Sequence, residues 1–175
     1  MNQRRAGLLL INTGDGKGKT TAAIGTAFRA LGHGMRVAII QFIKGKWRTG
    51  ERKLGEHTEN LIWLTMGNGC TLHSADRTKD HDAARSAWTR AQELLQSEEL
   101  DLLILDEILY AINLKFVSAG EVVAALNVRR AHLHVILTGR YAPAELIEIA
   151  DLVTEMRTIK HPFEKGGKGQ IGLDF

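Results

Sequence analysis

Short apolar runs alternate along the chain with segments in which apolar residues recur every three or four positions. Apolar runs of this kind that end in polar residues are typical of buried parallel strands, and the recurring spacing is typical of amphipathic helices. We therefore predict strands at residues 8–11, 37–40, 61–64, 100–105, 132–137 and 152–159. Helices are predicted at residues 19–31, 81–96, 108–114, 118–127 and 143–150, with one helical turn at 52–55 inside a polar loop that spans 43–60. This alternation predicts an α/β fold with a doubly wound, mostly parallel sheet.

Several of these elements have local signals at their ends. Ser118 and Glu121 have the spacing of a capping box, which marks a helix start. Pro143 is suited to the first position of a helix. Residues 1–175 show no linker, repeat or low-complexity stretch, so we predict one domain.

A glycine-rich turn stands between the first predicted strand and the first predicted helix. It reads Thr13-Gly14-Asp15-Gly16-Lys17-Gly18-Lys19-Thr20. Its last three residues match the P-loop pattern, although Thr13 replaces the usual first glycine. A β-branched residue favours extended backbone, so we expect Thr13 to end the strand and Gly14 to make the turn. We expect backbone N–H groups and Lys19 to bind phosphates, and the Thr20 hydroxyl to bind Mg²⁺.

Two acids follow the fourth predicted strand. In a P-loop protein, a carboxylate at this place holds Mg²⁺ directly or through water, which makes Asp106 and Glu107 candidates. The alternative is a pair of acids that favours a helix N-terminus. The chain lacks an Asn-Lys-x-Asp guanine signature, so ATP is favoured over GTP. These features predict a P-loop NTPase of RecA-like architecture, and an ATPase in which Glu107 polarises water stays open.

Other polar segments also follow predicted strands, where ligands of doubly wound sheets bind. They make Gln41, Lys44 and Arg140 candidate site residues. The basic loop, defined as Lys44, Lys46, Arg48, Arg52 and Lys53, is either solvated surface or a substrate contact. Cys70 and His73 are too few for a zinc site. We expect His132 and His134 to share a strand face as hydrogen-bonded histidines rather than as metal ligands.

Composition and charge indicate the compartment of the protein and the kinds of partner it binds. The net charge of +3 suits an anionic substrate without requiring nucleic acid. A single cysteine cannot form an internal disulfide, which favours a reducing compartment. The apolar runs are too short for a signal sequence or a membrane span. We therefore expect a cytoplasmic, soluble protein with neither a membrane nor a nucleic-acid partner.

The chain resembles the P-loop corrinoid adenosyltransferases, of the ATP:cob(I)alamin and cobyrinate type. The likeness covers residues 14–34, the run VAIIQFIKG at 37–45, residues 50–52, 105–107, 138–140 and 160–163, and the ending QIGLDF at 170–175. The QFIKG run and the QIGLDF ending are specific, because generic P-loop proteins lack them. The resemblance implies transfer of the 5′-deoxyadenosyl group of ATP to the Co(I) of a reduced corrinoid. Triphosphate leaves intact, and ATP is held with its phosphates reversed against the loop.

The same resemblance assigns roles to residues and partners. It implies that Mg²⁺, or Mn²⁺, is held by Thr20 and Glu107, with Asp106 a weaker candidate. Triphosphate contacts fall on Gly14, Asp15, Gly16, Lys17, Gly18, Lys19, Thr20, Thr21 and Arg29. The protein needs no covalent nucleophile, because cobalt is the nucleophile. Expected partners are ATP, the corrinoid, an electron donor such as a flavoprotein, and a second copy of the chain in a homodimer.

Two departures from the family pattern concern the second substrate. Many members have Phe-Thr-Trp in the loop after the third strand, where the aromatic pair packs against the corrinoid. Here that loop contains Gly69, Cys70, Thr71 and Leu72. Cys70 and Leu72 fill less volume, so we expect Trp47 or Trp63 to compensate or the corrinoid step to be weakened or altered. The alternative function is therefore a P-loop ATPase or a nucleotide-dependent binding protein of the same fold without corrinoid transfer. Relatives often carry an N-terminal helix over the site; here we expect a more open site or another covering segment.

Overall fold

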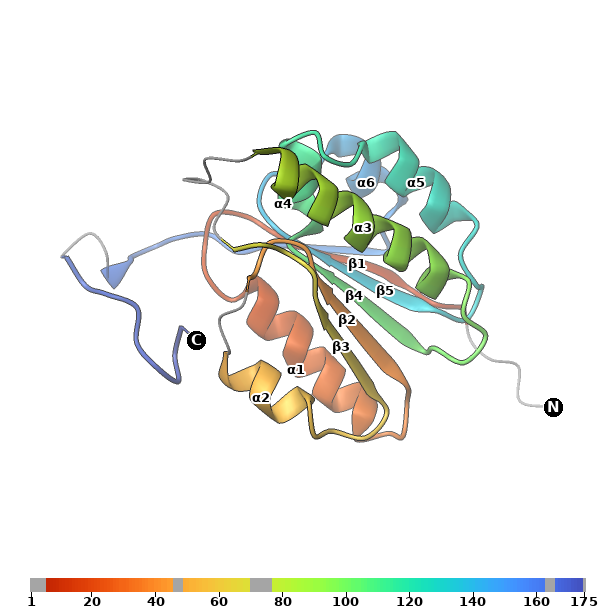
Figure 1. Ribbon diagram of the computed structural model, residues 1–175, viewed down its shortest axis with the longest axis horizontal. Helices are drawn as coiled ribbons and strands as arrows, with labels where there is room; N and C mark the ends of the chain where they lie inside the picture. Colours follow the sequence, from red (N-terminus) through yellow and green to blue (C-terminus); the bar gives the residue numbers. More distant parts are fainter. Residues whose placement is uncertain (1–5, 46–48, 70–76, 163–165, 175) are drawn as a thin grey trace.

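The computed structural model describes residues 6–45, 49–69, 77–162 and 166–174. Its centre is a six-stranded sheet in the order β3-β2-β4-β5-β1-β6 (Figure 1). All five strand pairings are parallel. The strands are β1 Leu9–Thr13, β2 Val37–Gln41, β3 Leu61–Thr65, β4 Leu102–Asp106, β5 His134–Thr138 and β6 Leu152–Glu155. The predicted α/β class and parallel sheet are confirmed.

Helices cover both faces of the sheet. The helices are α1 Lys19–Leu31, α2 Gly50–Gly55, α3 Arg77–Leu95, α4 Ile108–Asn113, α5 Ala119–Asn127 and α6 Ala144–Ile149. Figure 1 shows α1 and α2 on one face and α3, α4, α5 and α6 on the other. Within the described residues, no helix is both long and apolar enough to cross a membrane.

The sheet divides the core into two layers. On the α1 face, Ile39, Ile104 and Ile136 pack against α1. On the opposite face, Leu103 and Leu137 pack against a larger cluster that includes the fully buried Trp88 of α3. Burial on both faces explains why the strands are continuous apolar runs rather than alternating ones.

The strand register brings one polar residue from each central strand to the same edge. Gln41 pairs with Asp106 across β2 and β4, and Asn12 pairs with Thr138 across β1 and β5. The pairing of parallel strands therefore fixes the edge at which the P-loop begins. This is the edge at which doubly wound folds bind ligands.

Some element ends differ from the prediction. The predicted sixth strand stops at Glu155 rather than residue 159, because the following chain turns toward the P-loop: Met156 N–H donates to the Thr13 carbonyl and the Met156 carbonyl accepts from Gly16 N–H. Pro143 caps α6 with an extended ψ of 145° and is not its first residue. The capping box at Ser118 and Glu121 is confirmed.

The prediction that His132 and His134 share a strand face is wrong. His132 lies before β5, so it does not share a strand face with His134. His134 Nδ1 accepts a hydrogen bond from the Leu8 N–H at 3.0 Å, which is a structural role at the start of the sheet.

Candidate nucleotide-binding site

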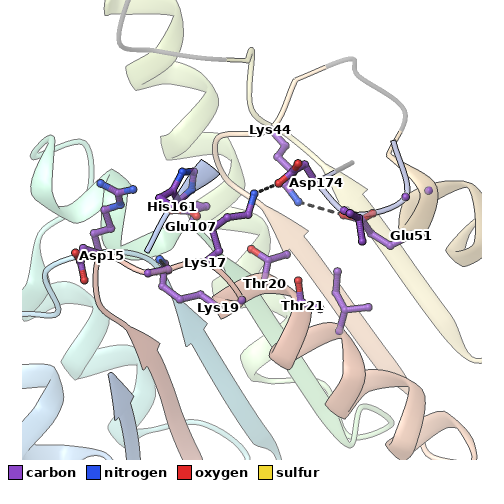
Figure 2. A pocket seen from close by; sticks show the side chains of 17 residues that line it. Asp15, Lys17, Lys19, Thr20, Thr21, Lys44, Glu51, Glu107, His161 and Asp174 are labelled. Carbon is purple, nitrogen blue, oxygen red and sulfur yellow. Dashed lines mark hydrogen bonds and ion pairs between the residues drawn. The ribbon is translucent and has the colours of Figure 1, made fainter. Parts of the chain in front are cut away.

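An open cavity of about 560 Å³ lies at the carboxyl ends of the strands, a size typical of small-molecule sites. Its wall consists mainly of the P-loop, with contributions from the β2–α2 loop, the β4–α4 junction and the C-terminal segment (Figure 2). The lining residues are Asp15, Gly16, Lys17, Gly18, Lys19, Thr20, Thr21, Ile24, Lys44, Gly50, Glu51, Glu107, Arg140, His161, Gly172, Leu173 and Asp174. Most of the predicted site residues therefore meet in one place.

The P-loop backbone takes a conformation that depends on glycine. Thr13 ends β1 as predicted, and Gly14 and Gly18 follow with φ of 100° and 106°. Such left-handed angles strain residues with a side chain. Gly18 is also the N-cap of α1, so the loop leads into the positive end of a 13-residue helix.

The Lys19 ammonium lies inside the loop. Its Nζ donates to the Gly14 carbonyl at 2.9 Å and to the Gly16 carbonyl at 2.6 Å, and the residue is 7% exposed. An ammonium has three protons, so one remains for a ligand. Burial lowers the pKa of Lys19, while the charge of Glu107 acts in the opposite direction. The result is a fixed, partly desolvated positive charge facing the cavity, which suits a polyphosphate.

The chain directly after β6 is hydrogen-bonded to the P-loop at Met156. Gly16 N–H donates to the Met156 carbonyl at 2.7 Å, so this amide is already engaged within the protein. A Cβ atom at Gly16 would lie 2.8 Å from the same carbonyl oxygen, which is closer than packing allows. Sequence reasoning missed this clamp, because hydrogen bonds between backbone groups leave no pattern in the side chains.

Replacing Gly16 with alanine is expected to lower the melting temperature and to weaken ATP binding about 10-fold. The added methyl group forces the P-loop away from Met156, and overpacking of this kind costs roughly 1–3 kcal/mol. Calorimetry and ATP titration measure the two effects. Gly25→Ala is the matched control, because a Cβ at Gly25 meets nothing within 4 Å and alanine favours a helix. Unchanged ATP binding by Gly16→Ala would contradict a tight clamp.

The two acids at the end of β4 occupy different environments. Asp106 is 1% exposed and does not line the cavity. Its Oδ1 accepts from Thr20 Oγ1 at 2.7 Å and from Thr138 Oγ1 at 2.8 Å. Glu107 does line the cavity, because its backbone turns there into the left-handed region at φ 62°. The Asp106 carboxylate therefore organises the site, whereas the Glu107 carboxylate faces the ligand space.

Electrostatics distinguish Glu107 further. Burial raises the pKa of Glu107, and the neighbouring Asp106 charge raises it again, while Lys19, Lys44 and Arg140 lower it. Because burial and the Asp106 charge disfavour the ionised form of Glu107, a cation bound beside it would stabilise that form. A titratable group whose pKa is shifted by burial and by specific charges beside a P-loop is a candidate functional group.

The oxygen donors at this place fit Mg²⁺. Thr20 donates its hydroxyl proton to Asp106, so its lone pairs remain available to a cation, and Glu107 supplies a carboxylate. The described residues contain no cluster of three or more His, Cys, Asp or Glu that could hold a metal alone. Mg²⁺ commonly binds through one or two protein oxygens, with water and substrate phosphates completing its shell.

Only one described member of the basic loop lines the cavity. Lys44 lies beside Glu51 (Figure 2), with its Nζ 3.3 Å from Glu51 Oε1. The same Nζ lies 3.7 Å from Asp106 Oδ2. Arg52 instead bonds Glu56, the C-cap residue of its own helix, at 3.0 Å, and Lys53 is exposed. Lys46 and Arg48 lie outside the described residues.

The C-terminal segment supplies residues to which sequence reasoning gave no role. His161 and residues 172–174 line the cavity, and Asp174 forms an ion pair with Lys17 of the P-loop (Figure 2). Glu51, opposite Lys44, was also missed. The run QIGLDF stood out in the sequence, but nothing in it indicated that it would return to a loop more than 150 residues earlier.

Four other predicted residues in the described part of the chain do not line the cavity. One is Gly14, whose carbonyl accepts a hydrogen bond from Lys19 Nζ. Arg29 is an exposed residue in the last turn of α1, at the opposite end of that helix from the P-loop. Gln41 is 1% exposed and lies beneath the cavity, against Asp106. Gly69 bonds the Ile43 carbonyl through its N–H at 3.1 Å, beside the β2–α2 loop. Cys70, Thr71, Leu72, His73 and Trp47 lie outside the described residues.

Comparison with known proteins agrees with this geometry. The family model described as ATP:corrinoid adenosyltransferase BtuR/CobO/CobP matches residues 5–175. The chain belongs to this family. Among solved structures, a KaiC-like protein from Pyrococcus horikoshii is similar, with a TM-score of 0.50 at 17% identity over 86% of this chain and 73% of the other, which indicates a shared fold.

Curated relatives of this adenosyltransferase family match nearly the whole chain. A corrinoid adenosyltransferase from Sinorhizobium sp. is 47% identical over 97% of this chain and 80% of its own length. Corrinoid adenosyltransferases from Escherichia coli K12 and Salmonella typhimurium are 43% and 41% identical, each over 99% of this chain and 88% of the relative. The family assignment made from the P-loop, QFIKG and QIGLDF runs is therefore confirmed.

Proposed function

We propose that this adenosyltransferase family member moves the 5′-deoxyadenosyl group from ATP to the cobalt of a reduced corrinoid. The Co(I) centre donates an electron pair to the ribose 5′ carbon and becomes Co(III) as the cobalt–carbon bond forms. The bond between that carbon and the triphosphate oxygen breaks, and its electron pair leaves with triphosphate. The observation that carries the proposal is a P-loop cavity with Lys19, Thr20 and Glu107 at its centre, in a chain matching corrinoid adenosyltransferases over almost its full length.

The protein's task in this reaction is to bind a leaving group. Triphosphate carries several negative charges, and the cavity offers Lys17, Lys19, Lys44 and Arg140. Fixed cations aimed at developing charge lower a barrier without reorganising during the reaction. We propose that ATP lies with its phosphates reversed against the P-loop, so that the ribose carbon points away from Lys19 toward the second substrate.

We propose that Thr20 and Glu107 hold Mg²⁺, or Mn²⁺, with Asp106 acting through Thr20. The ion, when bound, would offset part of the negative charge of the leaving triphosphate. The hydrogen bond from Thr20 to Asp106 supports this assignment, because it turns the hydroxyl lone pairs away from the carboxylate.

The second substrate would lie near the loop after β3. Gly69 bonds the loop after β2 at Ile43, and Lys44 and Gly45 follow on that loop. We place the corrinoid beside Gly69 and the segment 70–72. We further propose a homodimer in the cytoplasm, one domain per chain, and a flavoprotein-type donor that reduces Co(II) to Co(I).

One assay tests the proposal. The protein is incubated with ATP, Mg²⁺ and chemically reduced cobalamin, and both the corrinoid spectrum and the phosphate products are followed. We expect a cobalt–carbon adduct and an equal amount of triphosphate, with neither product when the corrinoid is omitted. Orthophosphate released without corrinoid would overturn the proposal in favour of an ATPase. Parallel reactions with Mn²⁺ and with EDTA test the metal.

A further inference from the structure

The Gln41 side chain joins two parts of the site that are separate in sequence. Its Oε1 accepts from Trp63 Nε1 at 3.1 Å and from Thr65 Oγ1 at 3.0 Å, both on β3. Its Nε2 donates to Asp106 Oδ2 at 3.1 Å on β4. Two donors on one side and an acceptor on the other permit only one orientation of the amide. Gln41 is 1% exposed, so water does not compete for these bonds.

Hydrogen bonds of the Asp106 carboxylate connect Gln41 to both proposed metal ligands, Thr20 and Glu107. While Gln41 holds Oδ2, Oδ1 accepts from Thr20 and Thr138. The Thr138 hydroxyl in turn accepts from the Glu107 backbone N–H at 2.9 Å. Lys44 Nζ also lies 3.7 Å from Oδ2. Rotation of the Asp106 carboxylate would therefore move the Thr20 hydroxyl and loosen the Glu107 backbone together.

The backbone of Gln41 strengthens the connection to β3. Its carbonyl accepts from Met66 N–H at 3.0 Å and from Gly67 N–H at 3.2 Å, where the chain leaves β3 toward Gly69. One residue thus bonds the end of β3 through its main chain and side chain, and bonds the carboxylate beneath the P-loop.

We propose that Gln41 is a positioning residue for the metal site, which it holds in register with the end of β3 through Asp106. This inference rests on the proposed function, because it concerns the Mg²⁺ that Thr20 and Glu107 would share. Outer partners of metal ligands act in this way, since they orient donors that touch the ion. Gln41 itself touches neither the metal nor ATP.

The test measures how ATP binding depends on Mg²⁺, without any corrinoid. Gln41→Met keeps an unbranched chain of similar size and removes all three side-chain hydrogen bonds. We expect the Mg²⁺ concentration for half-maximal ATP binding to rise about 10-fold, as for other outer partners of metal ligands. Binding at saturating Mg²⁺ should be recovered. Trp63→Phe removes one donor at the far end and should shift the Mg²⁺ requirement in the same direction, but less.

A control separates positioning from loss of stability. Val122→Ala removes buried volume on α5, away from the cavity, and should lower the melting temperature without changing the Mg²⁺ requirement. The inference is overturned if Gln41→Met needs the same Mg²⁺ as the unmodified protein, or if Val122→Ala shifts the requirement equally. If the unmodified protein binds ATP with no response to Mg²⁺, the metal role and this inference both fail. If the Mg²⁺ shift appears but no adenosylated corrinoid forms, the proposed transfer fails while the positioning role stands.

Discussion

Replacing Lys19 with methionine is expected to weaken ATP binding about 100-fold and to abolish measurable transfer at ordinary ATP concentrations. The Lys19 ammonium is the most buried cation lining the cavity. Hydrogen bonds to charged groups contribute roughly 1.5–3 kcal/mol, and each 1.36 kcal/mol corresponds to a factor of ten. Isothermal titration with ATP and Mg²⁺ measures the loss, and the melting temperature shows whether the loop still folds.

Two matched variants sharpen this result. Lys17→Met removes a cation from the same loop whose side chain is 52% exposed and already paired with Asp174, so we expect a loss below about 10-fold. Lys19→Arg keeps the charge, but the guanidinium is bulkier and holds its N–H groups in one plane, so it should not reproduce the ammonium's bonds to the Gly14 and Gly16 carbonyls, and affinity should still fall. Lys19→Met binding within about threefold of the unmodified protein would show that the loop amides alone bind the nucleotide.

The main elements could be predicted because their signals are local. The helix at residues 19–31 has the predicted bounds, since a P-loop ends in a lysine that begins a helix and the Gly32-His33-Gly34 run ends it. The buried strands were found because parallel strands covered on both faces must be apolar throughout. The helix α3 starts at Arg77, earlier than predicted. The prediction missed its first turn because residues 77–80 are polar and show no apolar spacing.

The parts that escaped prediction depend on contacts between distant segments. Met156 meets Gly16 because β6 lies beside β1, an arrangement that no local pattern specifies. Asp174 reaches Lys17 only because the chain turns back after β6. The residue pattern alone did not distinguish the buried Asp106 from the cavity-facing Glu107, which only the family resemblance ranked, since that difference arises from a left-handed backbone angle at Glu107.

Replacing Glu107 with glutamine is expected to stabilise the ligand-free protein at neutral pH while it removes Mg²⁺-dependent ATP binding. Burial and the Asp106 charge raise the pKa of Glu107 above its ordinary value, so the folded protein binds this proton more tightly than the unfolded chain. The free energy of unfolding therefore falls as pH rises from the ordinary carboxyl pKa through the raised pKa of Glu107. Glutamine has no such charge, so its melting temperature should exceed that of the unmodified protein at neutral pH, and the difference should disappear in acid.

The Glu107 charge, which destabilises the ligand-free protein, should instead favour binding of Mg²⁺ and ATP. A proton and Mg²⁺ compete for Glu107, so Mg²⁺-dependent ATP binding by the unmodified protein should weaken as pH falls through the raised pKa. In Glu107→Gln, a metal ligand worth several kcal/mol is lost, and we expect binding at saturating Mg²⁺ to fall about 100-fold, without that pH dependence. Melting curves and ATP titrations across pH measure both effects on the same samples. A variant that melts lower at neutral pH, yet keeps its response to Mg²⁺, would mean that Glu107 supports the fold. A higher melting temperature at neutral pH together with weaker Mg²⁺-dependent ATP binding would mean that the Glu107 charge destabilises the free protein and is needed to bind the metal.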